Sequence, residues 1–421
     1  MANFQAINDE ELLPHLFRLE YSKMTAVLCR HFGLSHIEVA EDIASETFLK
    51  ASENWVINGI PENPTAWLYT VAKNKAKDYL KRLAVFETRM KTTLPPNEIE
   101  LEEDFEFSSQ NISDSQLAMI FVVCNPGNSF ESQICLALQV LCGFSVEEIA
   151  NAFLTKSETI KKRLHRARTN LRNDNFQVKI LNEKEVTSRL DTVLRTLYLL
   201  FNEGYFSKSN DQLIRKDLCS EAVRLTLILT ENPQTNTPQV NALLALMCFQ
   251  SSRLEARTNN KGEVILFDEQ DKSLWDQMLI EKGNYYLVSA CSGNETSKYH
   301  LEAAIAYWHT ASITEDKWQH ILQLYNQLIL LEYSPVTALN RAFAFAKVYG
   351  RHKAIAEVEK LSLTESNYYY ELLGYLHANT DIDKAINYYK KAIELTRSKI
   401  EKQTLTKEIE QLRLKGKVSG L

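Results

Sequence analysis

The most concentrated set of charged side chains in the sequence is basic and lies between residues 156 and 172. This segment holds seven Lys or Arg residues and one Glu, in a chain whose formal net charge is −6. At about 100° per residue, Lys162, His165, Arg166 and Thr169 fall on one side of a helix. The opposite side is apolar and consists of Ile160, Leu164, Ala167 and Leu171. An exposed cationic face can contact phosphates and guanine edges, although many basic helices are simply solvated.

Two short helices are expected to position this basic face. Ser145 and Glu148 have the spacing of a capping box, which predicts a helix from about Val146. After a break of about three residues, Ser157 is the expected N-cap of the basic helix, with Glu158 in its first turn. A capped helix, a short turn and a second helix with a cationic outer face predict a helix-turn-helix.

A second pair of helices with opposite charge lies near the amino terminus. Apolar residues recur at helical spacing along "EVAEDIASETFLKASENWV" and leave an acidic outer face. Asn63 and Pro64 then have the types of an N-cap and a first helical residue, opening the basic helix "TAWLYTVAKNKAKDYLKR". An acidic helix is therefore expected beside a basic one.

These two segments together resemble a known family. "VAEDIASETFLKASENW" followed by "NPTAWLYTVAKNKAKDYLKR" is similar to region 2 of an extracytoplasmic-function (ECF) sigma factor of bacterial RNA polymerase. "FSVEEIANAFLTKSETIKKRLHRARTNLR" is similar to region 4 of the same family. The resemblance implies an all-α fold with region 2 at residues 10–83 and a helix-turn-helix region 4 at 114–175. An acidic linker at 84–113, with six acidic residues between 98 and 106, joins them.

The resemblance also implies a role for particular positions. The residues expected to dock on core RNA polymerase are Asp42, Ser45, Glu46 and Phe48, although Phe48 equally suits the internal core. Those expected at the −10 element are Trp67, Asn74, Lys75, Lys77, Asp78, Lys81 and Arg82, of which Trp67 is also a core candidate. Those expected at the −35 element are Lys156, Ser157, Thr159, Lys161, Lys162, His165 and Arg166. The acidic linker would run toward the RNA path, where its charge imitates nucleic acid; solvated disorder is the alternative.

The carboxy-terminal half, residues 180–421, exceeds what an ECF sigma factor needs. "NTDIDKAINYYKKAIEL" has the spacing of a tetratricopeptide-repeat (TPR) helix, and several blocks resemble the TPR-like extension of one ECF group. Polar residues in these blocks are candidates to line a groove for a peptide, protein or small effector, or else form caps and inter-helix hydrogen bonds. They are Asn202, Glu203, Arg257, Asp268, Asp271, His300, Asn340 and Arg341. The extension is expected to regulate activity.

Composition excludes several other classes of protein. Seven scattered Cys and nine His show no metal-ligand spacing. The family resemblance leads us to expect "CCHP" near the start of region 4, whereas this chain has "VCNPG" at 123–127. No phosphate-binding loop or nucleophile motif occurs, so we expect no enzyme, no catalytic residues, and no cofactor or metal. The sequence predicts a cytoplasmic protein without a membrane segment. The alternative to a sigma factor is a helix-turn-helix regulator that binds DNA without polymerase and senses a ligand through its helical domain.

Overall fold

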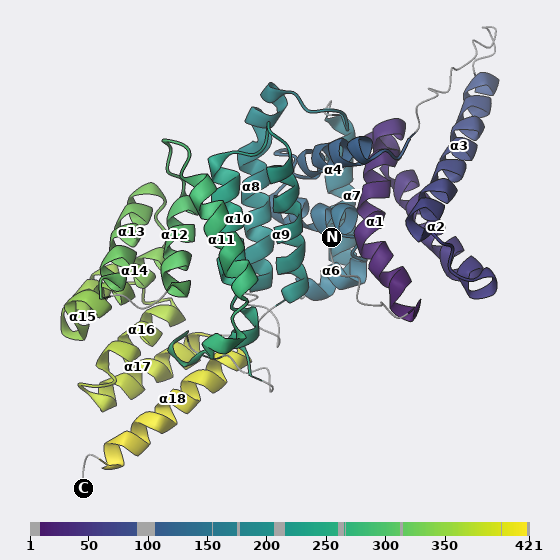
Figure 1. Cartoon of the computed structure of the whole chain (residues 1–421). Coiled ribbons are helices and arrows are strands. Elements are labelled where there is room, and N and C mark those ends of the chain that lie inside the picture. The colour runs from purple at the N-terminus through teal and green to yellow at the C-terminus, as the bar shows by residue number, and fades with distance from the viewer. Residues whose placement is uncertain are drawn as a thin grey trace. The chain divides into compact units, whose positions relative to one another are not determined.

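The computed structural model describes residues 9–90, 106–153, 155–174, 177–205, 215–259, 265, 267–311, 315–396 and 398–418. The regular elements of these residues are helices, which confirms the all-α prediction (Figure 1). The chain divides into two compact units, residues 1–199 and 200–421. No helix in the described part is long and apolar enough to cross a membrane.

The first unit begins with three helices built by the expected signals. They are α1 (Asp9–Phe32), α2 (Ile37–Asn58) and α3 (Pro64–Met90), with the short 3-10 helix η1 (Leu34–His36) before α2. The Asn63 side chain accepts a hydrogen bond from the Ala66 N–H at 3.0 Å, so the predicted N-cap of α3 is confirmed. Gly59, at φ 78°, ends α2 in a conformation that favours glycine.

The rest of the first unit is a second helical group. It contains α4 (Ser109–Val123), α5 (Phe130–Leu136), the π-helical η2 (Ala137–Leu141), α6 (Val146–Ala152), α7 (Ser157–Asn173) and the first part of α8 (Glu183–Tyr205). The second half of α4, from Leu117 to Val123, is buried throughout, because α4 packs between α1 and the elements that follow it. We call α4–α7 the HTH unit.

Two predicted boundaries differ from the observed helices. The expected linker at 84–113 is helical at both ends, since α3 continues to Met90 and α4 begins at Ser109. Most of its acidic run lies outside the described residues. The divide between the units falls at 199/200, not at 180, because residues 189–196 of α8 bond to the HTH unit.

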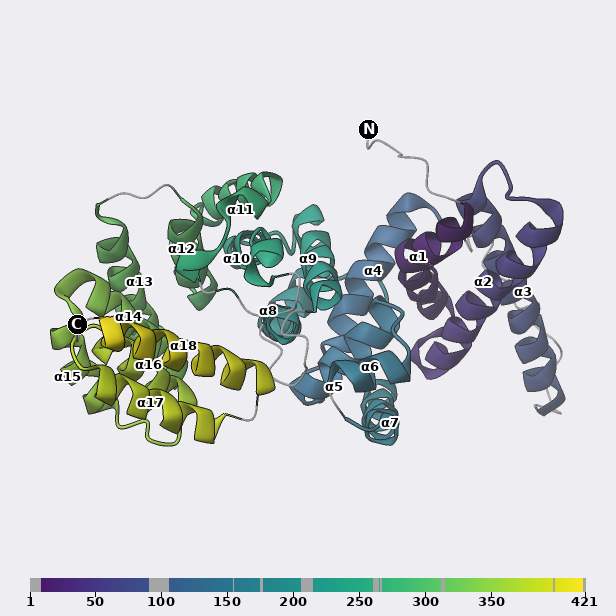
Figure 2. The same ribbon diagram turned by 90° about the horizontal axis from the view of Figure 1, so that it is seen from below.

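The second unit is a succession of antiparallel helices. It contains α9 (Lys216–Glu231), α10 (Pro238–Ser251), η3 (Leu254–Arg257), η4 (Phe267–Glu269), η5 (Lys272–Leu274), α11 (Gln277–Ala290), α12 (Lys298–Thr310), α13 (Lys317–Leu331), α14 (Pro335–Tyr349), α15 (Arg351–Leu361), α16 (Asn367–His377), α17 (Ile382–Leu395) and α18 (Lys399–Val418). Helix α10 is buried on nearly all sides, with α9, α11 and α12 packed around it. Figure 2 shows α16, α17 and α18 side by side.

Helices α16 and α17 pack closely against each other. Ala385, Tyr389 and Ala392 of α17 are buried, as expected for the inner face of a repeat helix. A Cβ at Gly374 of α16 would lie 2.5 Å from the Tyr389 ring, so only glycine allows this approach. The TPR-like assignment itself stays a prediction.

A half-buried carboxyl on α16, which is influenced by two carboxyls of α18, gives the second unit a pH-dependent stability. Burial, together with the charges of Glu401 and Glu408, raises the pKa of Glu371 to about 7. The folded state therefore holds this proton more tightly than the unfolded state, and the free energy of unfolding falls as pH rises from about 4.5 to about 7. We expect Glu371→Gln to raise the melting temperature by several degrees at pH 8, and by much less at pH 5.

Thermal unfolding followed by circular dichroism at the two pH values measures this effect. Glu394→Gln, an exposed position on α17, is the matched control and should change neither melting temperature. An equal shift at both pH values for Glu371→Gln would show that ionisation of this carboxyl is not the cause.

Candidate nucleic-acid interface

The two helices of the predicted helix-turn-helix are present as α6 and α7, which pack against each other. Ser145 accepts a hydrogen bond from the Glu148 N–H at 3.2 Å, and the Glu148 carboxylate accepts one from the Ser145 N–H at 2.7 Å. This confirms the capping box. The N-cap of α7 was predicted wrongly: it is Lys156, without a side-chain cap, and Ser157 is the first helical residue. No side chain therefore caps the backbone N–H groups at the start of α7, and these groups can donate hydrogen bonds to a phosphate.

The outer face of α7 is exposed and cationic. Lys162, His165, Arg166 and Thr169 are all exposed, and so are Lys156, Thr159 and Lys161, while Ser157 is half-buried. Lys161 forms an ion pair with Glu158 at 3.1 Å. Within the described part of the chain no carboxylate pairs with Lys162 or Arg166. These two cations are therefore available to an anionic partner.

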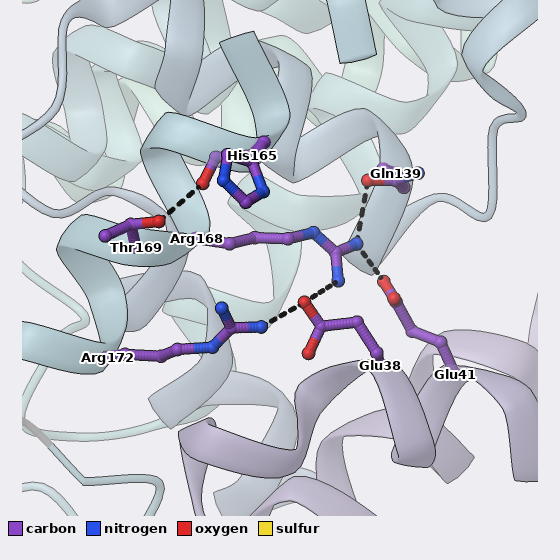
Figure 3. A network of polar contacts seen from close by, with 7 residues as sticks. All are labelled: Glu38, Glu41, Gln139, His165, Arg168, Thr169 and Arg172. Atoms are coloured by element: carbon purple, nitrogen blue, oxygen red, sulfur yellow. Dashed lines mark hydrogen bonds and ion pairs between the residues drawn. The ribbon is translucent and has the colours of Figure 1, made fainter. Parts of the chain in front are cut away.

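The inner face of α7 carries an ionic network that sequence reasoning missed (Figure 3). Helical spacing places Arg168 on a flank of α7, next to the cationic face, yet its side chain is buried, with only 7% of the residue exposed. Its guanidinium lies 2.8 Å from a Glu41 carboxylate oxygen and donates to the Gln139 side chain at 2.8 Å. Arg172 forms an ion pair with Glu38 on the same helix α2. The one sequence feature that indicated a contact with α2 was the series of acidic residues at helical spacing along that helix.

The two carboxyls of this network respond differently to their surroundings. Burial raises the pKa of Glu41 even though the Arg168 charge opposes the change. Partial burial alone would also raise the pKa of Glu38, but the hydrogen bond from Arg172 and the Arg168 charge lower it overall. Glu41 is thus the more deeply buried partner, and it depends on Arg168 to remain charged.

The candidates on α2 fall into two groups. Asp42, Ser45 and Glu46 are exposed and form an acidic surface on the helix. Phe48 is 5% exposed, and its ring packs edge-on against Phe17 at 5.1 Å between centroids. Phe48 therefore lies in the core of this structure, which is the alternative that the sequence left open.

The candidates on α3 form a mainly basic surface. Asn74, Lys77, Asp78, Lys81 and Arg82 are exposed, whereas Lys75 forms an ion pair with Glu46 of α2. Trp67 is half-buried and packs edge-on against Trp55, with 5.6 Å between ring centroids. The structure thus brings one polymerase-docking candidate and one −10 candidate into direct contact.

Comparison with known proteins identifies the family of this chain. Sigma-70 region 2 matches residues 16–85, and a family of unknown function, DUF6596, matches residues 189–291. The uncharacterized protein R00370 of Rhizobium meliloti (strain 1021) is 32% identical over 352 residues, which cover 82% of this chain and 81% of that protein. The chain belongs to the ECF-like sigma factors that carry a C-terminal extension. No solved structure matches it significantly.

The family match identifies the domain to which α1–α3 belong. The sigma-70 region 2 match covers α2 and nearly all of α3, so both candidate surfaces lie in a domain that acts with core RNA polymerase and promoter DNA. Sigma factors act in transcription initiation and are not an enzyme family. The DUF6596 match begins within α8, at Arg189, whose side chain donates a hydrogen bond to Asp174, the C-cap residue of α7.

The "VCNPG" segment of the sigma factor has a packing role. Cys124 is fully buried, and burial raises the pKa of its thiol to about 12. Asn125 donates to Asp174, and its carbonyl accepts from the Gln133 side chain at 2.9 Å. No group of three or more potential metal ligands occurs in the described residues. Where relatives were expected to have "CCHP", this chain has a hydrogen-bonded turn.

Several polar candidates in the extension act as caps or inter-helix bonds. Asp271 accepts from the Ser273 N–H at 2.9 Å, and His300 accepts from the Ser297 N–H at 3.1 Å. Arg257 donates to the Tyr205 carbonyl at 2.9 Å, and Arg341 to Asn326 at 2.6 Å. Asn202 and Glu203 are half-buried, Asn340 is exposed, and the side chain of Asp268 lies outside the described residues. An effector groove stays a prediction.

Proposed function

We propose that this sigma factor directs promoter-specific initiation by reading the −35 element with α7 and the −10 element with α3. The observation that carries the proposal is the exposed cationic face of α7, on which Lys162 and Arg166 have no carboxylate partner among the described residues, in a chain that also contains sigma-70 region 2. Lys162 and Arg166 project from the second helix of a helix-turn-helix, the position from which side chains reach base edges in the major groove. In this proposal the HTH unit binds the −35 element.

At the −10 element, α3 supplies attraction and polar contacts. Lys77, Lys81 and Arg82 are free of carboxylate partners among the described residues and can contact phosphates. Asn74 and Asp78 offer hydrogen bonds, and the accessible part of Trp67 offers a stacking surface for a flipped base. Strand opening follows from tighter binding to the melted form than to the duplex, and no covalent chemistry is needed.

Core polymerase docks on the acidic surface of α2 in this proposal. Asp42, Ser45 and Glu46 suit a basic helical partner, because complementary charge guides association and fixes orientation. Lys75 pairs with Glu46 here, so polymerase binding would release Lys75 toward DNA. The acidic linker, largely outside the described residues, would follow the RNA path, and the extension would regulate activity.

A transcription assay with purified components tests this proposal. The full chain is mixed with core RNA polymerase and a promoter library, and holoenzyme formation and run-off transcripts are measured. We expect transcripts from a restricted set of promoters, and only when the sigma factor is present. Operator binding without polymerase, and no specific transcript, would overturn the proposal in favour of a conventional helix-turn-helix regulator.

A further inference from the structure

The ring of Phe267, in η4, is the centre of a cluster of aromatic and cationic side chains in the second unit. The Arg253 guanidinium lies 4.4 Å from the centre of this ring, and the Trp275 ring lies 6.2 Å from it. His309 of α12 packs against the same ring with 4.9 Å between centroids, and the Lys317 ammonium lies 5.9 Å away. We call these five residues the Phe267 cluster. Separate segments of the chain thus bring two cations and two nitrogen-containing rings around one apolar ring.

Two polar atoms of the Phe267 cluster are buried without a hydrogen-bond partner. They are the indole Nε1 of Trp275 and the imidazole Nδ1 of His309, and neither bonds to any of the described residues. Trp275 is only 6% exposed, so its N–H has little access to bulk water. A buried donor without an acceptor lowers stability, and proteins rarely keep one unless a bound molecule supplies the missing bond.

The positive charge of Arg253 is not neutralised by a carboxylate of the described residues. Its Nε donates to the Gln270 side chain at 3.2 Å, which leaves the two Nη groups for another acceptor. Burial lowers the pKa of the guanidinium, because its charged form is poorly solvated there. Two acidic residues near it in sequence are engaged elsewhere, since Glu255 pairs with Lys216 and Asp271 caps η5. A bound anion would therefore neutralise a charge that the described residues leave uncompensated.

A small oxyanion meets these requirements better than a water molecule does. The planar N–H fork of arginine suits the oxygens of a carboxylate or a phosphate. The Trp275 indole can only donate, so its missing partner is an acceptor. Burial and the charges of Arg253 and Lys317 lower the pKa of His309 to about 3, so its neutral ring can donate from Nδ1 in one tautomer. Water can also accept these bonds, but it cannot neutralise the guanidinium.

We propose that the Phe267 cluster is a binding site for a small oxyanion, a carboxylate or a phosphate, held by the Arg253 guanidinium and the Trp275 indole. The inference rests on the proposed function only in that the anion would be the effector through which the extension regulates activity. Arg257 donates to the Tyr205 carbonyl at 2.9 Å and lies 3.8 Å over the Tyr205 ring. Tyr205 is the last residue of α8, so the anion would bind close to the end of that helix.

The indole N–H signals of the full chain test this site. The protein is labelled with ¹⁵N-tryptophan, and the Trp275 signal is identified by its loss in Trp275→Phe. Sodium phosphate and sodium acetate are titrated separately at constant ionic strength, with sodium chloride as the reference. We expect one of the two oxyanions to shift the Trp275 signal saturably, with half-saturation below about 10 mM, and chloride to leave it in place. The oxyanion that binds more tightly identifies the class of ligand.

Substitutions of arginine distinguish this site from general attraction of anions. Arg253→Gln removes the charged fork and is expected to weaken binding at least about tenfold. Arg413→Gln removes an exposed arginine of α18 and is the matched control, which should bind as the wild type does. The bound anion should also raise the melting temperature of the wild type and of the control, but not that of Arg253→Gln. Should Arg253→Gln fail to fold, Arg253→Lys keeps the charge without the fork and should still bind more weakly.

The outcomes separate this inference from the proposed function. A Trp275 signal that moves with neither oxyanion, or equally in the wild type and in the Arg253 variant that folds, would overturn the site. Because binding is measured without polymerase or promoter, that result would leave the reading of the −35 and −10 elements untouched. Binding that is lost with Arg253, in a protein that gives no promoter-specific transcripts, would support the site and contradict the proposed function.

Discussion

Replacing both Lys162 and Arg166 with alanine is expected to lower promoter-specific transcription about 100-fold. Each residue is exposed on the outer face of α7 and has no carboxylate partner among the described residues. A side chain that reads a base edge contributes about 1–3 kcal/mol of discrimination, so losing two such contacts predicts an effect of about this size. Folding should be unaffected, because neither side chain packs in the core.

The control for this variant removes the same charge from a nearby surface. Lys179 and Lys184 are exposed and lie beyond α7, so alanine at both should leave transcription within about twofold. The salt dependence of promoter binding separates two roles: loss of phosphate contacts reduces the slope of log affinity against log salt by about 0.9 per contact. Full activity of the Lys162 and Arg166 double variant would remove α7 from the readout surface.

Truncating the chain before or after α8 is expected to have very different effects on the HTH unit. The side chain of Thr196 donates to Gln133, which is 1% exposed, and Arg189 pairs with Asp174. Arg195 also lies over the Phe130 ring at 4.3 Å. A chain that ends at Leu181 loses all three contacts, so we expect its melting temperature to fall by about 10 °C or more. A chain that ends at Tyr205 should keep the HTH unit folded.

Hydrogen exchange in α4–α7 measures this difference. Protection of these helices should be close to that of the full chain when the truncation follows Tyr205, and should be largely lost when it follows Leu181. Equal protection in both truncated chains would show that α8 does not support the HTH unit. The result also decides where the extension can be removed to test regulation, since a cut at 180 would confound regulation with unfolding.

Local signals in the sequence predicted much of the first unit. The capping box at Ser145 and the Asn63–Pro64 start of α3 depend on neighbouring residues, and both were confirmed. The exposed face of α7 also follows from helical spacing alone. The N-cap at Ser157 failed because Lys156 already has the extended backbone of an N-cap, although its side chain cannot accept a hydrogen bond.

Contacts between distant segments were beyond local reasoning. Arg168 and Glu41 are 127 positions apart, and no periodicity in α7 indicates that one of its arginines is buried against α2. Phe48 was ambiguous for the same reason, because its partner Phe17 comes from another helix. The 199/200 divide likewise depends on long-range bonds from α8.

The most direct test of the central claim is run-off transcription with core RNA polymerase and the promoter library, comparing the wild-type chain with the Lys162 and Arg166 double variant. The account predicts specific transcripts with the wild-type chain, and about 100-fold fewer with the variant at equal holoenzyme formation. Transcripts of equal yield and specificity from both proteins, or no polymerase-dependent transcript from either, would contradict it.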